Sequence, residues 1–129
     1  MENQALTEHR KILVVEDDRY TNELISKTLK MTGFEVKSVY SGEDALEEVN
    51  KDLPDLIVLD LLLPKMDGWD VCRTLRKEGN PARKVPIVIA SVLSKHDVQQ
   101  TEEAMGILSF FNKPFNPTDL ITEINRILR

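Results

Sequence analysis

Side chains that can do chemistry stand directly after short apolar runs in this sequence. Four such runs end, in chain order, at Glu16-Asp17-Asp18, at Asp60, at Ser91 and at Lys113. Short apolar runs are typical of buried strands. The carboxyl ends of parallel strands share one edge of a sheet, where open α/β sheets bind ligands. If these runs are parallel strands, carboxylates, a hydroxyl and an ammonium group converge there.

The acidic members of this set, Glu16, Asp17 and Asp60, would repel one another in one pocket. Carboxylates a few ångströms apart raise each other's proton affinity unless a cation lies among them. Carboxylate oxygens in a partly open site favour Mg²⁺, which keeps several of its water ligands. The sequence therefore predicts a site for a divalent cation, with Mg²⁺ as the expected ion.

Length and composition exclude several classes of protein. The chain has 129 residues, 41% of them hydrophobic, which suits one domain with one core. Its 17 basic and 22 acidic residues give a net charge of −5, so direct nucleic-acid binding is not expected. No apolar stretch approaches the roughly 20 residues that cross a bilayer, and the N-terminus has no signal-peptide pattern. We expect a cytoplasmic protein without a membrane partner.

Strand-like runs alternate with segments of helical period, the pattern of βαβ units around a parallel sheet. The expected strands are residues 11–15, 35–39, 56–60, 85–90 and 110–111. The expected helices are residues 19–31, 42–50, 69–77, 95–105 and 117–128. Residues 1–10 are polar and expected to be flexible, so residues 11–128 form the folded core of a single domain that covers residues 1–129.

Local signals mark several of these boundaries. Gly33 is a C-cap signal for the first helix, Ser41 can cap the second, and Pro117 suits the first turn of the last. The spacing of apolar residues in the first helix predicts an inward face formed by Leu24, Ile25, Thr28 and Leu29. The only cysteine, Cys72, excludes an intramolecular disulfide and is expected to be a packing residue in the third helix.

Four separate motifs occur in the order found in one known family. They are ILVVEDD at residues 12–18, DLLLPKMDG at residues 60–68, Ser91, and Lys113-Pro114-Phe115. Together they resemble the response-regulator receiver domains of two-component signalling, over nearly the whole chain from residue 11 to residue 128. The resemblance implies an α/β fold: a flavodoxin-like, doubly wound sheet of five parallel strands in the order 2-1-3-4-5, with five helices.

The resemblance also implies roles at the predicted site. Asp60 would be the phosphoacceptor, which takes a phosphoryl group from a partner histidine with the help of Mg²⁺. The implied metal ligands are Asp17, Asp60 and the Leu62 backbone carbonyl directly, and Glu16 through a water molecule. Lys113 and Ser91 would donate hydrogen bonds to the oxygens of the phosphorylated side chain. Capping of the following helix is the alternative for Ser91.

Signal output and partner choice follow from the same resemblance. Ser91 and Phe110 are implied as a switch, in which the hydroxyl moves toward the phosphate, the ring moves inward and partner binding changes. An aromatic residue at such a position also suits simple core packing. The donor would be a sensor histidine kinase or a histidine phosphotransfer protein, and its docking surface would include Asp18, Tyr20, Thr21, Leu24 and Phe115. Core packing is the alternative for Tyr20 and Leu24, and the residues do not name a downstream protein target.

Apolar residues flank the expected site. Leu62 and Leu93 would restrict the approach of water to a phosphorylated aspartate, and Val92 would crowd the entrance. We therefore expect a long-lived phosphorylated form. The apolar segment at residues 105–109 is either an interaction surface or a tight loop.

Two other classes compete with the receiver interpretation. An aspartyl-nucleophile phosphatase also places Asp at the end of a buried strand, but it needs a second Asp two residues later, where this chain has Leu62. A flavodoxin-like binding module would carry a glycine-rich phosphate loop after its first strand, and the sequence has none. We therefore expect a phosphoacceptor that assists its own phosphorylation and dephosphorylation, and not an enzyme. The Met1 start favours a free-standing receiver over a segment of a longer regulator.

Overall fold

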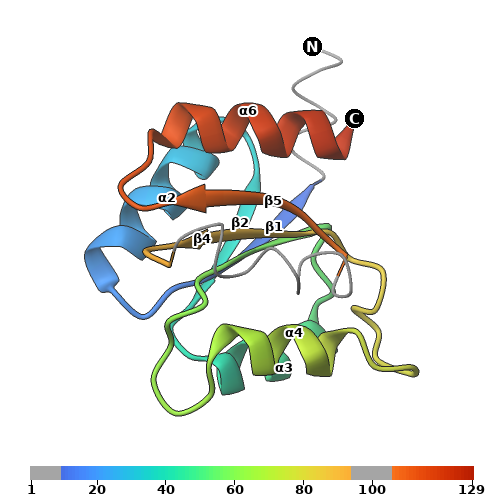
Figure 1. Ribbon diagram of the computed structural model, residues 1–129. Helices are drawn as coiled ribbons and strands as arrows, with labels where there is room; N and C mark the ends of the chain where they lie inside the picture. Colours follow the sequence, from blue (N-terminus) through green and yellow to red (C-terminus); the bar gives the residue numbers. More distant parts are fainter. Residues whose placement is uncertain (1–9, 94–105) are drawn as a thin grey trace.

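The computed structural model of the chain describes residues 10–93 and 106–129. Its elements are β1 (Lys11–Val15), α2 (Arg19–Met31), β2 (Glu35–Val39), α3 (Gly42–Lys51), β3 (Leu56–Leu59), α4 (Gly68–Leu75), β4 (Ile87–Ser91), β5 (Ile107–Asn112) and α6 (Pro117–Leu128). The strands form one parallel sheet in the order β2-β1-β3-β4-β5, which confirms the predicted α/β fold and strand order. Helices α2 and α6 cover one face of the sheet, and α3 and α4 cover the other (Figure 1).

Two expected segments fall outside the described residues. The helix predicted at residues 95–105 is one, so four of the five predicted helices can be compared with the structure. The segment predicted to be flexible, residues 1–10, is described only at Arg10. Among the helices that the structure describes, none is long and apolar enough to span a bilayer.

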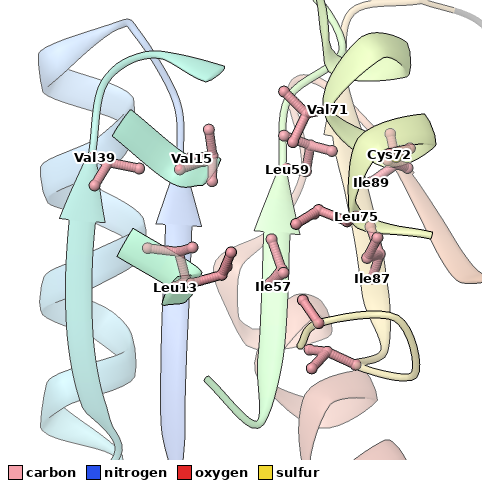
Figure 2. Packing of buried hydrophobic residues seen from close by; sticks show 14 of the residues in the cluster. Leu13, Val15, Val39, Ile57, Leu59, Val71, Cys72, Leu75, Ile87 and Ile89 are labelled. Carbon is pink, nitrogen blue, oxygen red and sulfur yellow. The ribbon is translucent and has the colours of Figure 1, made fainter. Parts of the chain in front are cut away.

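Side chains of the inner strands alternate between the two faces of the sheet, as the two-residue repeat of a strand requires. One face packs on α3 and α4, in a cluster shown in Figure 2 that includes Leu13, Val15, Ile57, Leu59, Ile87, Ile89, Val71, Cys72 and Leu75. The other face packs on α2 and α6 through a cluster that includes Ile12, Val14, Leu56, Val58, Val88, Ile25, Leu29, Leu120 and Ile124. Strands buried on both faces hold their carboxyl ends in fixed positions, and Cys72 has the predicted packing role.

Side-chain caps begin the four described helices. The cap residues are Asp18, Ser41, Asp67 and Asn116, and each side chain accepts a hydrogen bond from a backbone N–H of the first turn. Gly33 follows α2 with a φ of 108°, and its N–H donates to the Lys30 carbonyl at 3.0 Å. Pro117 is the first residue of α6. The boundary signals at Gly33, Ser41 and Pro117 are therefore confirmed.

Both later strands differ from their predicted bounds. β4 begins at Ile87 and not at Val85, because the Val85 N–H donates to Ala82 in a turn and Pro86 has no N–H to pair. β5 begins at Ile107 and not at Phe110, since its pairing with β4 starts there. Of the two alternatives for residues 105–109, the tight loop is therefore excluded from residue 107 onward, where the chain is strand, and the interaction surface stays a prediction.

Two helices also differ in detail. α2 turns Leu24 outward, where it is 43% exposed, although we predicted an inward position. Asn22 and Ser26 are buried in its place, beside Ile25 and Leu29. α4 spans Gly68–Leu75 and not residues 69–77, because the Lys77 N–H bonds to the Thr74 carbonyl and closes the chain into a turn.

Candidate functional site

The ends of β1 and β3 bring two buried carboxylates together. Val15 and Leu59 are partners in the register of these strands, and the Asp60 N–H donates to the Val15 carbonyl at 3.0 Å. The side chains that follow, Glu16 and Asp60, are 2% and 5% exposed. With the exposed Asp17, each offers one carboxylate oxygen, and these oxygens lie within 4.8 Å of one another. The structure therefore brings the three predicted acids to one edge of the sheet.

Lys113 directly follows β5, an edge strand of the sheet, and reaches the acidic cluster from there. Its backbone N–H donates to the Ser91 carbonyl at 2.8 Å, and the Lys113–Pro114 peptide bond is cis. Its Nζ donates to Asp60 Oδ2 at 3.0 Å and also to the Glu16 carboxylate. One ammonium group thus serves both buried carboxylates.

Burial and charge shift the pKa of Glu16 and that of Lys113. Burial, reinforced by the charge of Asp60, raises the pKa of Glu16 to about 7, against the hydrogen bonds that Glu16 accepts from Lys113 and from the Asp18 N–H. Burial acts to lower the pKa of Lys113, but its hydrogen bonds to the two carboxylates outweigh this and raise that pKa. Lys113 therefore stays charged near neutral pH, whereas Glu16 holds its proton more tightly than a carboxyl group in water does.

The donor set fits a hard divalent cation. Three carboxylates offer oxygen ligands at one point, and one ammonium group offsets only part of their charge. The exposed side chain of Asp17 keeps the cluster open to solvent on one side. Oxygen ligands with room for retained water are what Mg²⁺ prefers.

The loop after β3 is built around Asp60. The Leu62 N–H donates to Asp60 Oδ1 at 3.0 Å, so both carboxylate oxygens of Asp60 accept a hydrogen bond. The Gly68 N–H donates to the Leu61 carbonyl at 2.8 Å. A Cβ at Gly68 would lie 2.5 Å from Leu61 Cα and 2.6 Å from the Asp60 carbonyl oxygen. Only glycine lets the start of α4 lie this close to the loop.

The two expected switch residues lie on neighbouring strands. Ser91 is fully buried at the end of β4, and its Oγ accepts a hydrogen bond from the Leu93 N–H at 3.3 Å. Phe110 is the register partner of Ile89, and its ring is partly buried against the cluster under α3 and α4. The ring therefore has a packing role, and its switching role stays a prediction.

The residues expected on the partner surface have different environments. Tyr20 and Leu24 are 75% and 43% exposed, so neither is a core residue. Asp18 caps α2, and the hydroxyl and N–H of Thr21 donate to its carboxylate and lower its pKa. Phe115 is half-buried against the cluster under α2 and α6. Tyr20 and Leu24 are therefore the apolar side chains of this set that a partner could reach.

Two contributors to the site were not predicted from the sequence. Asn22 of α2 is fully buried and donates to the Glu16 carbonyl. A signal for it existed, because residues 22, 25, 26 and 29 share one helical face on which two residues are polar. No sequence signal indicated the contact of Gly68 with the Asp60 loop, since this contact depends on how α4 packs.

We expect Glu16→Gln to change the pH dependence of stability. Folding raises the pKa of Glu16 from 4.5 to about 7, so the folded state binds this proton more tightly than the unfolded chain. The stability that the proton provides is present below pH 4.5 and is lost as the pH rises through about 7. In metal-free buffer, urea unfolding from about pH 5 to about pH 8 should show Glu16→Gln gaining stability relative to wild type. Parallel pH profiles of the two proteins would contradict this expectation.

Comparisons with known proteins agree with this geometry. The family model described as the response regulator receiver domain matches residues 12–125. A relative described as probable transcriptional regulator ycf27, from Pyropia yezoensis, is 37% identical over 129 residues, which cover 100% of this chain and 50% of the relative. The chain spans about half the length of the curated relatives it matches.

Solved structures show the same likeness. Chemotaxis protein CheY4 of Vibrio cholerae is 28% identical, with a TM-score of 0.84 over 92% of this chain and 98% of that chain. The signal receiver domain of a signal transduction histidine kinase from Syntrophus aciditrophicus is 32% identical, with a TM-score of 0.81 over 92% of this chain and 89% of that chain. The chain therefore belongs to the response regulator receiver domain family of two-component signalling.

Proposed function

We propose that Asp60 is the phosphoacceptor of this receiver and that Mg²⁺ assists its phosphorylation. Receiver domains bind Mg²⁺ in an acidic pocket and interact with sensor kinases or phosphotransfer proteins. The main support here is that Asp60 Oδ2 lies 3.0 Å from the Lys113 ammonium, while Glu16, Asp17 and Asp60 each bring an oxygen within 4.8 Å of the others. A carboxylate held between an ammonium group and a cation site suits phosphoryl transfer.

In this proposal a carboxylate oxygen of Asp60 attacks the phosphorus of a phosphohistidine on the partner. The new O–P bond forms as the N–P bond breaks, and the electron pair of that bond stays on the imidazole nitrogen. Hydrogen bonds from the Leu62 N–H and from Lys113 orient Asp60 beforehand, which lowers the cost of reaching the reactive geometry. Bound Mg²⁺ supplies charge neutralisation for the phosphoryl oxygens.

Each site residue has a role in the proposal. Those that would hold Mg²⁺ are Asp17, Asp60 and the Leu62 carbonyl directly, and Glu16 through water. The phosphorylated side chain carries about −1.5 to −2 charges and three acceptor oxygens, so it needs donors. Lys113, whose Nζ already contacts Asp60, and Ser91, at the end of the adjacent β4, are the proposed donors.

The proposed phosphoryl donor is a sensor histidine kinase or a histidine phosphotransfer protein that docks over the exposed Tyr20 and Leu24, near Asp18, Thr21 and Phe115.

We place the chain in the cytoplasm, as a phosphoacceptor and not a turnover enzyme. Relatives described as transcriptional regulators are about twice as long as the matched region, so the output proposed here is a changed contact with another protein or an output domain. The net charge of −5 gives no support for direct nucleic-acid binding by this part.

Labelling by acetyl phosphate tests the role of Asp60. Intact-mass spectrometry should show one added phosphoryl group with Mg²⁺ and none with a chelator, and Asp60→Asn should abolish it because an amide is a poor nucleophile. Asp52→Asn is the matched control, since this exposed carboxylate pairs with Lys11 at the opposite edge of the sheet. Undiminished labelling of Asp60→Asn would remove the proposal, and rapid turnover of many phosphate esters would favour the phosphatase.

We also propose that the phosphorylated form is long-lived. Leu62 is 47% exposed beside Asp60, and Leu93 packs half-buried next to Ser91, so both present apolar groups where water must approach. Leu62→Gln and Leu93→Gln should therefore lose phosphate severalfold faster than wild type. Leu53→Gln, which changes a leucine of similar exposure, 46%, away from the site, should not. Equal rates of phosphate loss in all four proteins would disprove this role of the leucines.

The neighbouring Phe111, on the same strand, provides a matched control for testing the switching role of Phe110. Phe110 packs toward α3 and α4, whereas Phe111 packs toward α2 and α6. Phosphorylation should shift the backbone amide resonances of β4, β5 and α6, and Phe110→Ala should reduce these shifts more than Phe111→Ala does. NMR spectra at equal phosphorylation measure this. If the shifts in Phe110→Ala match those of wild type, the ring has only a packing role.

A further inference from the structure

A buried amide on α2 holds the backbone at the end of β1. The Asn22 side chain is fully buried, and its Nδ2 donates to the Glu16 carbonyl at 3.0 Å and to the Val39 carbonyl at 2.9 Å. The Glu16 N–H donates to the same Val39 carbonyl at 3.2 Å. Both backbone polar groups of Glu16 are thus tied, one to β2 directly and one to α2 through Asn22.

The bond to the Glu16 carbonyl has a direct consequence for Asp17. The Glu16 carbonyl and the Asp17 N–H belong to one planar peptide unit, which can turn only as a whole. A donor fixed on this carbonyl therefore sets the direction in which the chain enters Asp17. Asp17 itself is exposed, so the packing of its own side chain does little to restrain it. Asn22 restrains the peptide that joins the two neighbouring acids.

Ser26 completes the orientation of the amide. Its Oγ donates to Asn22 Oδ1 at 3.0 Å and lies 2.6 Å from Ser38 Oγ on β2. The opposite orientation of the amide would aim its oxygen at two carbonyl oxygens, so these partners settle which end is Nδ2. Every polar atom of the buried Asn22 side chain therefore has a partner, and the amide is a rigid donor.

We propose that Asn22 is a positioning residue for the cation site: its hydrogen bond to the Glu16 carbonyl presets the Glu16–Asp17 pair for Mg²⁺. This inference rests on the proposed function of the acidic cluster. Both Nδ2 hydrogen bonds of Asn22 go to backbone carbonyls, so Asn22 would act through the backbone that joins the two acids. Residues that orient metal ligands from behind typically change metal affinity by about 10–100-fold when they are replaced.

Mg²⁺ affinity, measured by isothermal titration calorimetry on the whole chain, tests this inference. Asn22→Ala and Asn22→Leu both remove the donor, and the leucine variant keeps most of the side-chain volume, so it serves if the alanine variant does not fold. Ser26→Ala is the matched control, because it removes a buried hydroxyl from the same network and leaves both Nδ2 hydrogen bonds in place. Urea unfolding of each variant, with and without Mg²⁺, reports stability separately from affinity.

We expect both Asn22 variants to bind Mg²⁺ about tenfold more weakly or worse, and Ser26→Ala to lose stability with its Mg²⁺ affinity nearly unchanged. Wild-type affinity in either Asn22 variant, or an equal loss of affinity in Ser26→Ala, would overturn the positioning role. The variant Asp17→Asn distinguishes failure of the positioning role of Asn22 from failure of the proposed metal site. If wild type binds Mg²⁺ and Asp17→Asn does not, normal binding by the Asn22 variants contradicts only the positioning role of Asn22. If wild type does not bind Mg²⁺, both the positioning role and the proposed metal site are wrong.

Discussion

Glu16 and Asp60 are nearly inaccessible to water, lie beside a third acid, and share the single ammonium group of Lys113. Removing one charged group from water costs several kcal/mol unless partners compensate for it, and the Coulomb energy of close like charges adds to that cost. The pKa of Glu16 is raised because its partners compensate only in part for its burial and for the charge of Asp60. The three acids therefore carry more negative charge than Lys113 can offset, which supports the proposal that a cation binds among them.

The rest of the domain keeps these acids from moving apart. The parallel register of β1 and β3 places their last residues side by side, and apolar packing on both faces of the sheet fixes the strands beneath them. The buried amide of Asn22 ties the end of β1 to β2. Close packing of Gly68, the first residue of α4, against the loop after β3 restrains Asp60. The repulsion between the three acids, which a small shift of the backbone would otherwise relieve, is therefore retained.

Much of this arrangement could be predicted from the sequence because it depends on short-range patterns. Apolar runs that end in charged residues identified Asp60 and Lys113, and the alternation of strand and helix implied that both reach one edge of the sheet. The strand order came from the family resemblance, and the paired backbone confirms it.

The errors have a common origin in tertiary packing. Leu24 was predicted inward because it fits the helical spacing of the apolar residues in α2. The face of α2 that meets the sheet instead carries Asn22 and Ser26, whose polar atoms bond to each other and to strand ends. The early start of β5 was missed because Ile107 pairs with a strand distant in sequence. The role of Gly68 was missed because it is a close approach of two backbone segments, which no local sequence pattern encodes.

The backbone and the side chain of Asp60, the proposed phosphoacceptor, are held in different ways. Helix α4 lies against the Asp60 loop with no side chain between them, so neither can yield without the other. The Asp60 side chain, by contrast, is contacted by the long, flexible side chain of Lys113, which directly follows the edge strand β5. We therefore expect a group added to the Asp60 carboxylate to find room by movement of the Lys113 side chain, because the backbone of the Asp60 loop is held against Gly68.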